Sequence, residues 1–455
     1  MQAYNELTQL NPDSHNGGSY GGNDGGGNLS SLTGGALYTM NRQRRLSEDG
    51  GTGPSWWTLF KHYWTPQRIT LALSISGLLL STAMERVSFK MSVDRLTPYR
   101  YLLGEVIIIV SFVVYACITT YKLRFTDKIT RRMKEFPHFK LVIMAILDTI
   151  SFFGLVLSAA GVTPTMTVIL LHISTPFVVL GSRLNFPSRQ YSQNQFQGVL
   201  LITIAVFISV IRHVMDIVTG VDETAAVCSL LYVSSAAAQG LGTVYKEMAI
   251  IEWSQPLDIH YMNMWLFFYQ SIAGILFAPV IYMFSGVSDR WNGFPLHSLP
   301  RNIHDGWICF FGSEEVHSSQ EYDTSDCECQ YALLIIFLYV ASNTVVLEFI
   351  DLVLQTSNQT LGRAMAGAVF VAFIALGIYD DKSEYRRDYD RVVGSIGIAD
   401  IISIVVLLIG IDLNGRDDEP NITTIVGATA VEAATGSTAE QNTETGEKRA
   451  DTTFS

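Results

Sequence analysis

The sequence has little charge for its length. Only 16% of its 455 residues are Asp, Glu, Lys or Arg, whereas 48% are hydrophobic. The hydrophobic residues gather in runs of about 20, the length that an α-helix needs to cross roughly 30 Å of hydrocarbon. Because lipid cannot hydrogen-bond to the backbone, such runs predict helices, and a β-barrel would show shorter alternating segments instead. We therefore expect an all-α polytopic membrane protein and exclude an ordinary soluble fold.

The sequence also lacks the usual motifs of enzymes. It has no Walker-type phosphate loop, which excludes direct use of ATP through that motif, no His-Glu-x-x-His metal site and no Gly-x-Ser-x-Gly nucleophile turn. The formal net charge of −12 lies mainly in tails and loops, so it indicates no nucleic-acid partner. We expect a protein that is not an enzyme and holds no cofactor or metal.

Neither end of the sequence has the pattern of a folded segment. Residues 1–53 are rich in Gly, Asn and Ser and contain no signal peptide, and residues 414–455 are rich in Thr, Ala and Glu. We expect two disordered cytosolic tails. Between the first tail and the first hydrophobic run, the aromatic-rich residues 54–66 predict a short helix in the membrane interface.

Ten membrane spans are expected between these tails. They fall near 69–93, 100–121, 140–161, 164–183, 195–212, 226–248, 260–284, 331–355, 359–379 and 392–412. The connection between the second and third spans is strongly basic, which predicts that it lies in the cytosol. The loop at 285–330 is acidic and should lie on the opposite, lumenal side.

The lengths of the connections repeat in the two halves of the chain, 67–220 and 221–413. In each half, a long connection follows the second helix and a very short one follows the third. Because five helices are an odd number, the second half must be inverted relative to the first. We therefore expect ten helices in two inverted five-helix repeats, a recurrent transporter design.

Charged and ionisable residues within spans are costly and need a reason. Asp148 lies among hydrophobic residues of the third span, with no basic residue within a helical turn. It is either a cavity-facing proton or cation site, or an Asp satisfied by the hydroxyls of Thr149 or Ser151. His172 lies one turn before Pro176, which predicts a helix kink and an accessible imidazole. A simple packing role for His172 is the alternative.

Other charged residues allow a less specific interpretation. Glu85 and Arg86 are adjacent, and neighbouring residues do not face each other on a helix, so one should point inward while the other reaches the headgroups. Residues near span ends are expected to be interfacial. These are Glu105, Lys246, Glu247, Glu348, Asp351, Arg363 and Asp400.

Several segments together resemble the chloroquine-resistance-transporter-like family of the drug/metabolite transporter superfamily. They are Met84–Lys90, Leu147–Thr149, His172–Pro176, Gln239–Glu247 and Leu299–Cys309, and the resemblance runs through most of 69–412. It implies an exporter of small solutes such as cationic drugs, amino acids, short peptides or glutathione-type thiols, driven by protons across an acidic vacuolar or endolysosomal membrane. It also implies that Arg86 selects substrate and that Asp148 lines the cavity. The further candidate residues of the substrate and proton cavity are His172, Glu85, Gln239, Glu348 and Asp351.

The sequence departs from the family pattern at some points. The resemblance implies disulfides in the lumenal loop, but with only three cysteines there at most one can form, between Cys309 and Cys329 or Cys327. A proline that relatives carry in the ninth span is missing from 366–372, and the eighth-span acids Glu348 and Asp351 are shifted in register. The absence of a plastid transit peptide makes a plastid envelope the less favoured location.

Two other functions stay open. A nucleotide-sugar or sugar-phosphate exchanger would need Lys or Arg deep in its cavity, and a non-transporting scaffold would use the tails for docking. For the exporter, the expected partners are membrane lipid, protons and a small-molecule substrate, with a monomer as the expected assembly.

Overall fold

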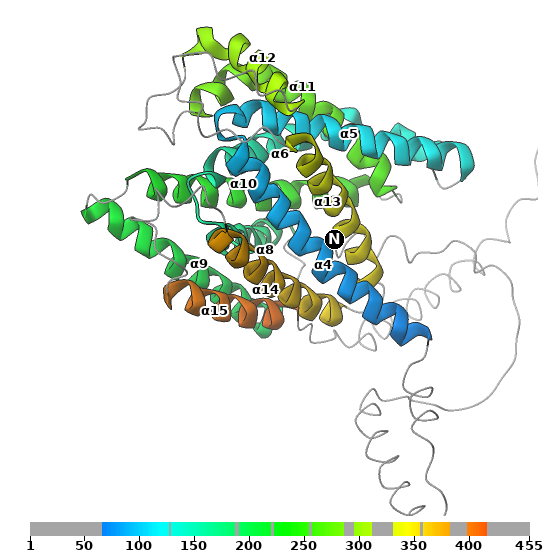
Figure 1. The fold of residues 1–455 in the computed structure, drawn as a ribbon. Helices are drawn as coiled ribbons and strands as arrows, with labels where there is room; N and C mark the ends of the chain where they lie inside the picture. Colours follow the sequence, from blue (N-terminus) through cyan, green and yellow to red (C-terminus); the bar gives the residue numbers. More distant parts are fainter. Residues whose placement is uncertain are drawn as a thin grey trace, which may run out of the picture.

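The computed structural model describes residues 66–126, 129–186, 191–219, 223–253, 257–285, 295–311, 331–354, 358–382 and 398–415. This part of the chain is helical and contains no strand (Figure 1). The α-helices are α4 (Pro66–Arg95), α5 (Arg100–Phe125), α6 (His138–Ala159), α7 (Pro164–Leu171), α8 (Ser174–Asn185), α9 (Gln193–Thr219), α10 (Glu223–Trp253), α11 (Ile259–Ser285), α12 (Leu299–Phe310), α13 (Ala332–Leu354), α14 (Asn358–Lys382) and α15 (Ile398–Asn414). The 3-10 turns are η1 (Thr97–Tyr99), η2 (Arg132–Glu135) and η3 (Leu296–Ser298). The expected tails and the interfacial helix at 54–66 lie outside the described residues.

Eight segments of the described chain are long and apolar enough to cross a bilayer. They are Thr97–Phe125, His138–Ala159, Pro164–Asn185, Gln193–Ile211, Ala225–Trp253, Ile259–Ser285, Ala332–Ile350 and Thr360–Asp380. Two other long helices are not among them: α4, whose second half carries several charged residues, and α15, which has 17 residues. The structure therefore supports eight of the ten expected spans.

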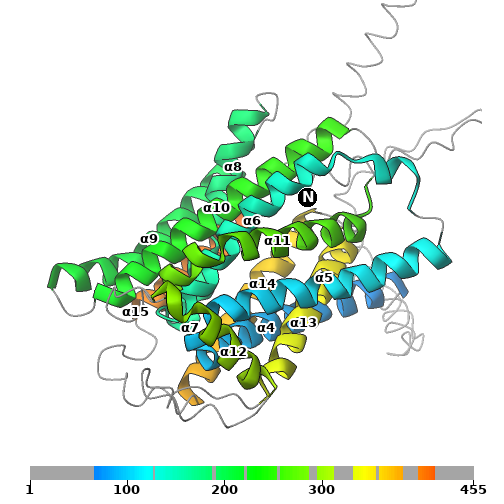
Figure 2. The ribbon, with the colours of Figure 1, turned by 90° about the horizontal axis from the view of Figure 1, so that it is seen from above.

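The helices form one bundle. Helix α4 packs along both α13 and α14, α5 along α11, and α6 against both α10 and α11. At the far side α9 packs along α15, and the two lie side by side in both views (Figures 1 and 2). The largest cluster of buried hydrophobic side chains draws on α4 to α7, α9, α10 and α12 to α15, so the two halves of the chain share one core.

Buried side chains lie at both ends of the bundle. At the end where α4 meets α5, every residue from Arg100 to Ile108 is buried, as is α7 from Pro164 to Leu170. At the other end, where α5 finishes and α11 begins, a second hydrophobic cluster that includes Met144 and Leu257 is buried. We call the first the closed end and the second the opposite end.

Helix α12 lies within the loop that was expected at 285–330, at the closed end (Figure 2). Pro300 stands in its first turn, where the missing amide hydrogen costs nothing. Gly306 of α12 approaches Tyr99 and Leu102, so that a Cβ at this position would overlap the end of the Leu102 side chain. Helix α12 therefore packs against Tyr99 and Leu102 at the start of α5, while α11 packs along the rest of α5.

Candidate functional site

Arg86 lies at the centre of a group of polar side chains drawn from four parts of the bundle. Its guanidinium acts electrostatically on Glu85 of α4, Tyr232 of α10, Tyr339 of α13 and His172 beside α7. Tyr232 is fully buried, whereas the Arg86 side chain is 30% exposed. We call these five residues the Arg86 cluster. The structure brings Glu85, Arg86 and His172 together as one site, and the two tyrosines were missed by the sequence reasoning.

Glu85 and Arg86 do not separate as expected. The Arg86 Nε atom lies 3.4 Å from Glu85 Oε2, and the Glu85 side chain is only 7% exposed. Although adjacent residues of a helix start in different directions, the long arginine side chain folds back and reaches the carboxylate. The pairing is physically reasonable because each group would otherwise leave an uncompensated charge inside the membrane.

His172 occupies a break between two helices. Helix α7 ends at Leu171 and α8 begins at Ser174, so His172 and Ile173 interrupt what would be one span. Pro176 stands in the first turn of α8, where it has no amide hydrogen to give and its ring disfavours a continuous helix. The amides of His172 and Thr175 bond three residues back, to Ile169 and His172 respectively. The imidazole is thereby held at an irregular point of the backbone, next to Arg86.

Helix α10 approaches this break through a glycine. A Cβ on Gly240 would overlap the Ser174 carbonyl oxygen, which is backbone and cannot move aside. On Gly242, two residues later, a Cβ would come no closer than 3.5 Å to the Asp148 carboxylate. Close approach of backbones at glycine is a common means of helix packing in membranes.

This difference gives a prediction with an internal control. Gly240→Ala should force α10 away from the break and lower the thermal unfolding midpoint and the yield of folded protein. Gly242→Ala should change the unfolding midpoint and the yield much less, because the added methyl group would lie at an ordinary contact distance from its neighbours. Thermal unfolding of the two purified variants in detergent, followed beside the wild type, measures the effect. Equal midpoints for the two variants would contradict the contact.

Asp148 of α6 forms an ion pair with a residue of another helix. Lys246 of α10 places Nζ 2.5 Å from Asp148 Oδ2, and the Asp148 side chain is 13% exposed. Its expected alternative partners do not take this role: the Thr149 hydroxyl donates to the Ala145 carbonyl and that of Ser151 to the Asp148 carbonyl. Lys246 was expected at the interface, and the correction follows from the length of α10, which continues to Trp253.

Glu348 also has a partner on another helix. Its carboxylate Oε1 lies 3.0 Å from His260 Nε2 of α11, while the Glu348 side chain remains 55% exposed. The His260 ring lies 6.0 Å from the ring of Tyr115 on α5. The side chain of Asp351 lies outside the described residues, and Gln239 is exposed on α10 rather than part of the Arg86 cluster.

An ion pair at the opposite end of the bundle links α5 to the start of α11, close to His260. Lys122 of α5 pairs with Asp258 at 2.8 Å, and the other carboxylate oxygen of Asp258 accepts from the amides of His260 and Tyr261 at the start of α11. Burial by itself would raise the pKa of Asp258. The hydrogen bonds from Lys122 and Tyr261 outweigh it and hold that pKa below its ordinary value. The carboxylate thus stays ionised as a helix cap.

The closed end contains a second set of buried charges. Lys90 pairs with Asp94 at 2.7 Å on α4 and donates to the carbonyl of Ala159, the last residue of α6, at 2.7 Å. Tyr379 of α14 donates to Asp94 at 3.3 Å. On α5, Arg100 donates to the carbonyl of Ser285 at the end of α11. Cations at helix carboxyl ends match the helix dipole, and these contacts hold the closed end together.

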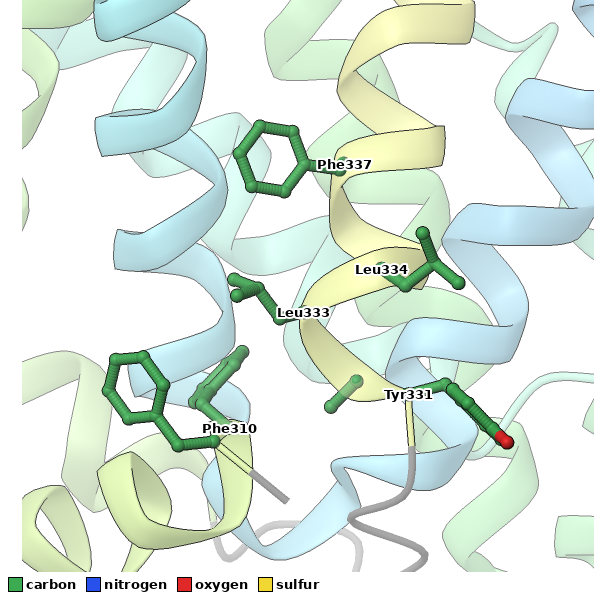
Figure 3. A pocket seen from close by; sticks show the side chains of 7 residues that line it. Phe310, Tyr331, Leu333, Leu334 and Phe337 are labelled. Atoms are coloured by element: carbon green, nitrogen blue, oxygen red, sulfur yellow. The ribbon is translucent and has the colours of Figure 1, made fainter.

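An apolar pocket of about 400 Å³ lies between the end of α12 and the start of α13 (Figure 3). Its lining is Phe310, Phe311, Tyr331, Ala332, Leu333, Leu334 and Phe337. Because it contains no charged side chain, it offers nothing that would recognise a charged solute. Cys309, beside it, is fully buried. Cys327 and Cys329 lie outside the described residues, so the expected disulfide stays a prediction.

A helical bundle whose membrane segments hold paired charges around a helix break defines a multi-pass membrane protein with a polar intramembrane site. Residues 71–412 match the chloroquine-resistance transporter-like (CRT-like) family, and the chain belongs to that family. This confirms the resemblance found in the sequence.

Similar proteins have been described from three kinds of organism. The chain is 23% identical over 321 residues to Crt homolog 1 of Dictyostelium discoideum, covering 66% of this chain and 65% of that protein. It is 23% identical over 288 residues to the chloroquine resistance transporter of Toxoplasma gondii, covering 62% and 32%. Protein CLT1, chloroplastic, of Arabidopsis thaliana is 26% identical over 230 residues, covering 50% and 49%. The match thus spans less than two thirds of each of these relatives.

Proposed function

We propose that this protein is a proton-coupled secondary exporter of small solutes across the membrane of an acidic vacuole or endolysosome. The observation that carries the proposal is the Arg86 cluster, in which a partly exposed arginine, a buried carboxyl and an imidazole meet at a helix break. Charge and irregular backbone are tolerated at membrane depth where they line a wet cavity. The family membership and the names of the relatives support transport.

The pattern of helix contacts supports two inverted halves with ten spans. Inversion would make each of α4, α5, α6, α7–α8 and α9 correspond to the helix five spans later, namely α10, α11, α13, α14 and α15. The contact of α6 with α10 would then be equivalent to that of α13 with α4, and both are extensive. Two further contacts, α5 with α11 and α9 with α15, would lie on the symmetry axis.

The charge of the connections gives the orientation. The segment after α5 carries Lys122, Arg124, Arg131, Arg132 and Lys134, and the positive-inside rule places it in the cytosol. The opposite end then faces the cytosol and the closed end, with α12, faces the lumen.

The paired charges favour solutes that carry both signs or a single positive charge. Glu85 and Asp148 can each attract an ammonium or a cationic drug if the solute competes with the resident Arg86 or Lys246. A nucleotide sugar would instead need spare cations. Within the described chain, the buried cations Arg86, Lys90 and Lys246 are paired with carboxylates. Arg100 donates to the carbonyls of Leu157 and Ser285. These resident partners disfavour the exchanger.

Release of solutes from membrane vesicles tests the proposal. Vesicles with an acidic interior, loaded in turn with labelled amino acids, a dipeptide, glutathione or chloroquine, should release at least one of these faster than protein-free vesicles. Release should slow when the interior is set to neutral pH. Release that ignores the pH gradient would refute coupling, and exchange of labelled nucleotide sugars alone would favour the exchanger. Capture of a tail-binding partner with no flux of any solute would favour a scaffold.

The role of Arg86 in selection gives a sharper prediction. Arg86→Ala leaves Glu85 without its cation, so the preference for a cationic over an anionic solute should rise by about tenfold, the equivalent of roughly 1.4 kcal/mol. Arg363→Ala is the matched control, because Arg363 is an exposed arginine paired with Asp412 at 3.6 Å. The ratio of chloroquine to glutathione flux measures the effect. An unchanged ratio would remove Arg86 from substrate selection.

A further inference from the structure

Glu105 has an environment unlike that of Glu85, Asp94, Asp148 and Glu348. It lies in the first turns of α5 and is buried, with 5% of its surface exposed, although its position near a span end predicted an interfacial residue. Its Oε1 atom accepts a hydrogen bond of 2.7 Å from the Ser271 hydroxyl of α11. Its Oε2 atom is buried and has no hydrogen-bond partner in the described part of the chain.

Among the described residues, no cation acts on the Glu105 carboxyl group. On the facing helix α11, Gly274 lies against it, and a Cβ there would overlap Oε2. From α6, the ring of Phe153 packs over the same place. On its own helix, the Glu105 carboxyl group acts electrostatically on the hydroxyl of Tyr101. Arg100, also on α5, points to the carbonyls of Leu157 and Ser285 instead.

Four other acids of the bundle are held differently. Glu85, Asp94, Asp148 and Glu348 each lie within 3.4 Å of the cationic or imidazole nitrogen of a neighbour. An ion pair stabilises the charged form of a carboxylate and so disfavours the uptake of a proton. An acid buried without one is stable only as the neutral carboxylic acid, because an isolated charge in an apolar interior is prohibitively costly.

Location adds a second, independent argument. Glu105 is five residues from the start of α5, about 8 Å along the helix axis, and therefore near the closed end. On the orientation proposed above, this end faces the acidic lumen. Ser271 and Gly274 belong to α11, so Glu105 lies at the contact of α5 with α11, which the proposed symmetry places on the axis between the halves.

We propose that Glu105 is the site that carries the coupled proton, taking it up from the lumen and releasing it when the contact of α5 with α11 opens. The proton binds to a carboxylate oxygen of Glu105 and leaves from the same atom, so no other group changes its covalent state. In the described arrangement the carboxyl is neutral. This inference rests on the proposed export function and adds to it the residue that performs coupling.

Infrared difference spectroscopy of the full-length protein in lipid tests the site without any substrate. The wild type should show the carbonyl stretch of a buried carboxylic acid that disappears as the pH is raised. Glu105→Gln should lack that band, and Glu252→Gln should keep it, because Glu252 is a surface acid paired with Lys140. A spectrum of Glu105→Gln identical to that of the wild type would overturn the proposal.

Transport measurements separate the site from the function. In vesicles with an acidic interior, Glu105→Gln should lose the release driven by the pH gradient while retaining exchange of the same solute at equal pH. Gradient-driven release equal to that of the wild type would refute the role of Glu105 and leave the exporter intact. If the wild type itself shows no flux, the export function fails and the infrared band alone decides whether Glu105 binds a proton. Should Glu105→Gln fold poorly, Ser271→Ala must shift the pH at which the band titrates, and no shift refutes the site.

Discussion

Asp148→Asn is expected to lower both gradient-driven transport and exchange by roughly 10-fold to 100-fold. The carboxylate of Asp148 lies 2.5 Å from Lys246 and is partly exposed, so it is placed to exchange its partner for a cationic group of the solute. Hydrogen bonds to charged groups contribute about 1.5–3 kcal/mol, and the loss of one accounts for a change of this size. Initial rates in vesicles with and without a pH gradient measure both modes.

A second variant separates transport from folding. Asp148→Asn alone leaves the Lys246 ammonium without its counter-charge, which costs about 3 kcal/mol when the pair is mostly buried. Combining it with Lys246→Gln should restore the unfolding midpoint but not the flux. Glu252→Gln, which breaks the exposed pair of Lys140 between the same two helices, is the control and should change neither. Recovery of flux in the double variant would show that the pair is only structural.

The contrast between Asp148 and Glu105 divides the mechanism into two measurable parts. Loss of Asp148 should affect every mode of transport, because it removes a group that binds solute. Loss of Glu105 should affect only the use of the gradient, because exchange at equal pH requires no net proton movement. The two phenotypes therefore distinguish a binding residue from a coupling residue by the ratio of accumulation to exchange.

Helix positions could be predicted from the sequence because they depend on local properties. Runs of hydrophobic residues gave segments that agree with the observed helices to within a few residues at most ends, as for α6, expected at 140–161 and observed at His138–Ala159. The break beside His172 was also predictable, since Pro176 acts on the preceding turn of its own helix.

Contacts between helices could not be predicted in this way. The partner of Asp148 is Lys246, which lies on a different helix and which the sequence placed at an interface. Helical periodicity gives the face on which a residue lies, but not which helix covers that face. The places of Tyr232 and Tyr339 in the Arg86 cluster could not be predicted for the same reason. A tyrosine in the middle of an apolar run was the available signal, because its hydroxyl needs a polar neighbour when buried.

Glu105 illustrates a different source of error. Its distance from the end of a span predicted contact with headgroups, and that reasoning assumed that the span end was bare. In the structure, Ser271 and Gly274 of α11 and Phe153 of α6 pack around the Glu105 carboxyl group. Two helices from other parts of the sequence thereby convert an expected interfacial acid into a buried one.

Burial should also decide how much an ion pair stabilises this protein, and the chain offers two pairs with the same spacing. Lys90 and Asp94 are four residues apart on α4, with the Lys90 side chain 4% exposed and the charged atoms 2.7 Å apart. Arg301 and Asp305 are four apart on α12, with the arginine 58% exposed and a separation of 3.7 Å. Helix geometry is therefore matched while solvent access differs.

Asp94→Asn should lower the free energy of unfolding by about 3–5 kcal/mol, because it removes the carboxylate that lies 2.7 Å from the buried Lys90 ammonium. Asp305→Asn should cost less than about 1 kcal/mol, since water solvates the arginine that remains. Unfolding of both variants in the same detergent, followed by helical circular dichroism, compares them directly. Equal losses would mean that Lys90 reaches water in solution, and the closed end would then be open to solvent. A large loss confined to Asp94→Asn would instead identify the contacts of Lys90 as the ones that seal this end, because the same charge change at the same spacing is harmless where water has access.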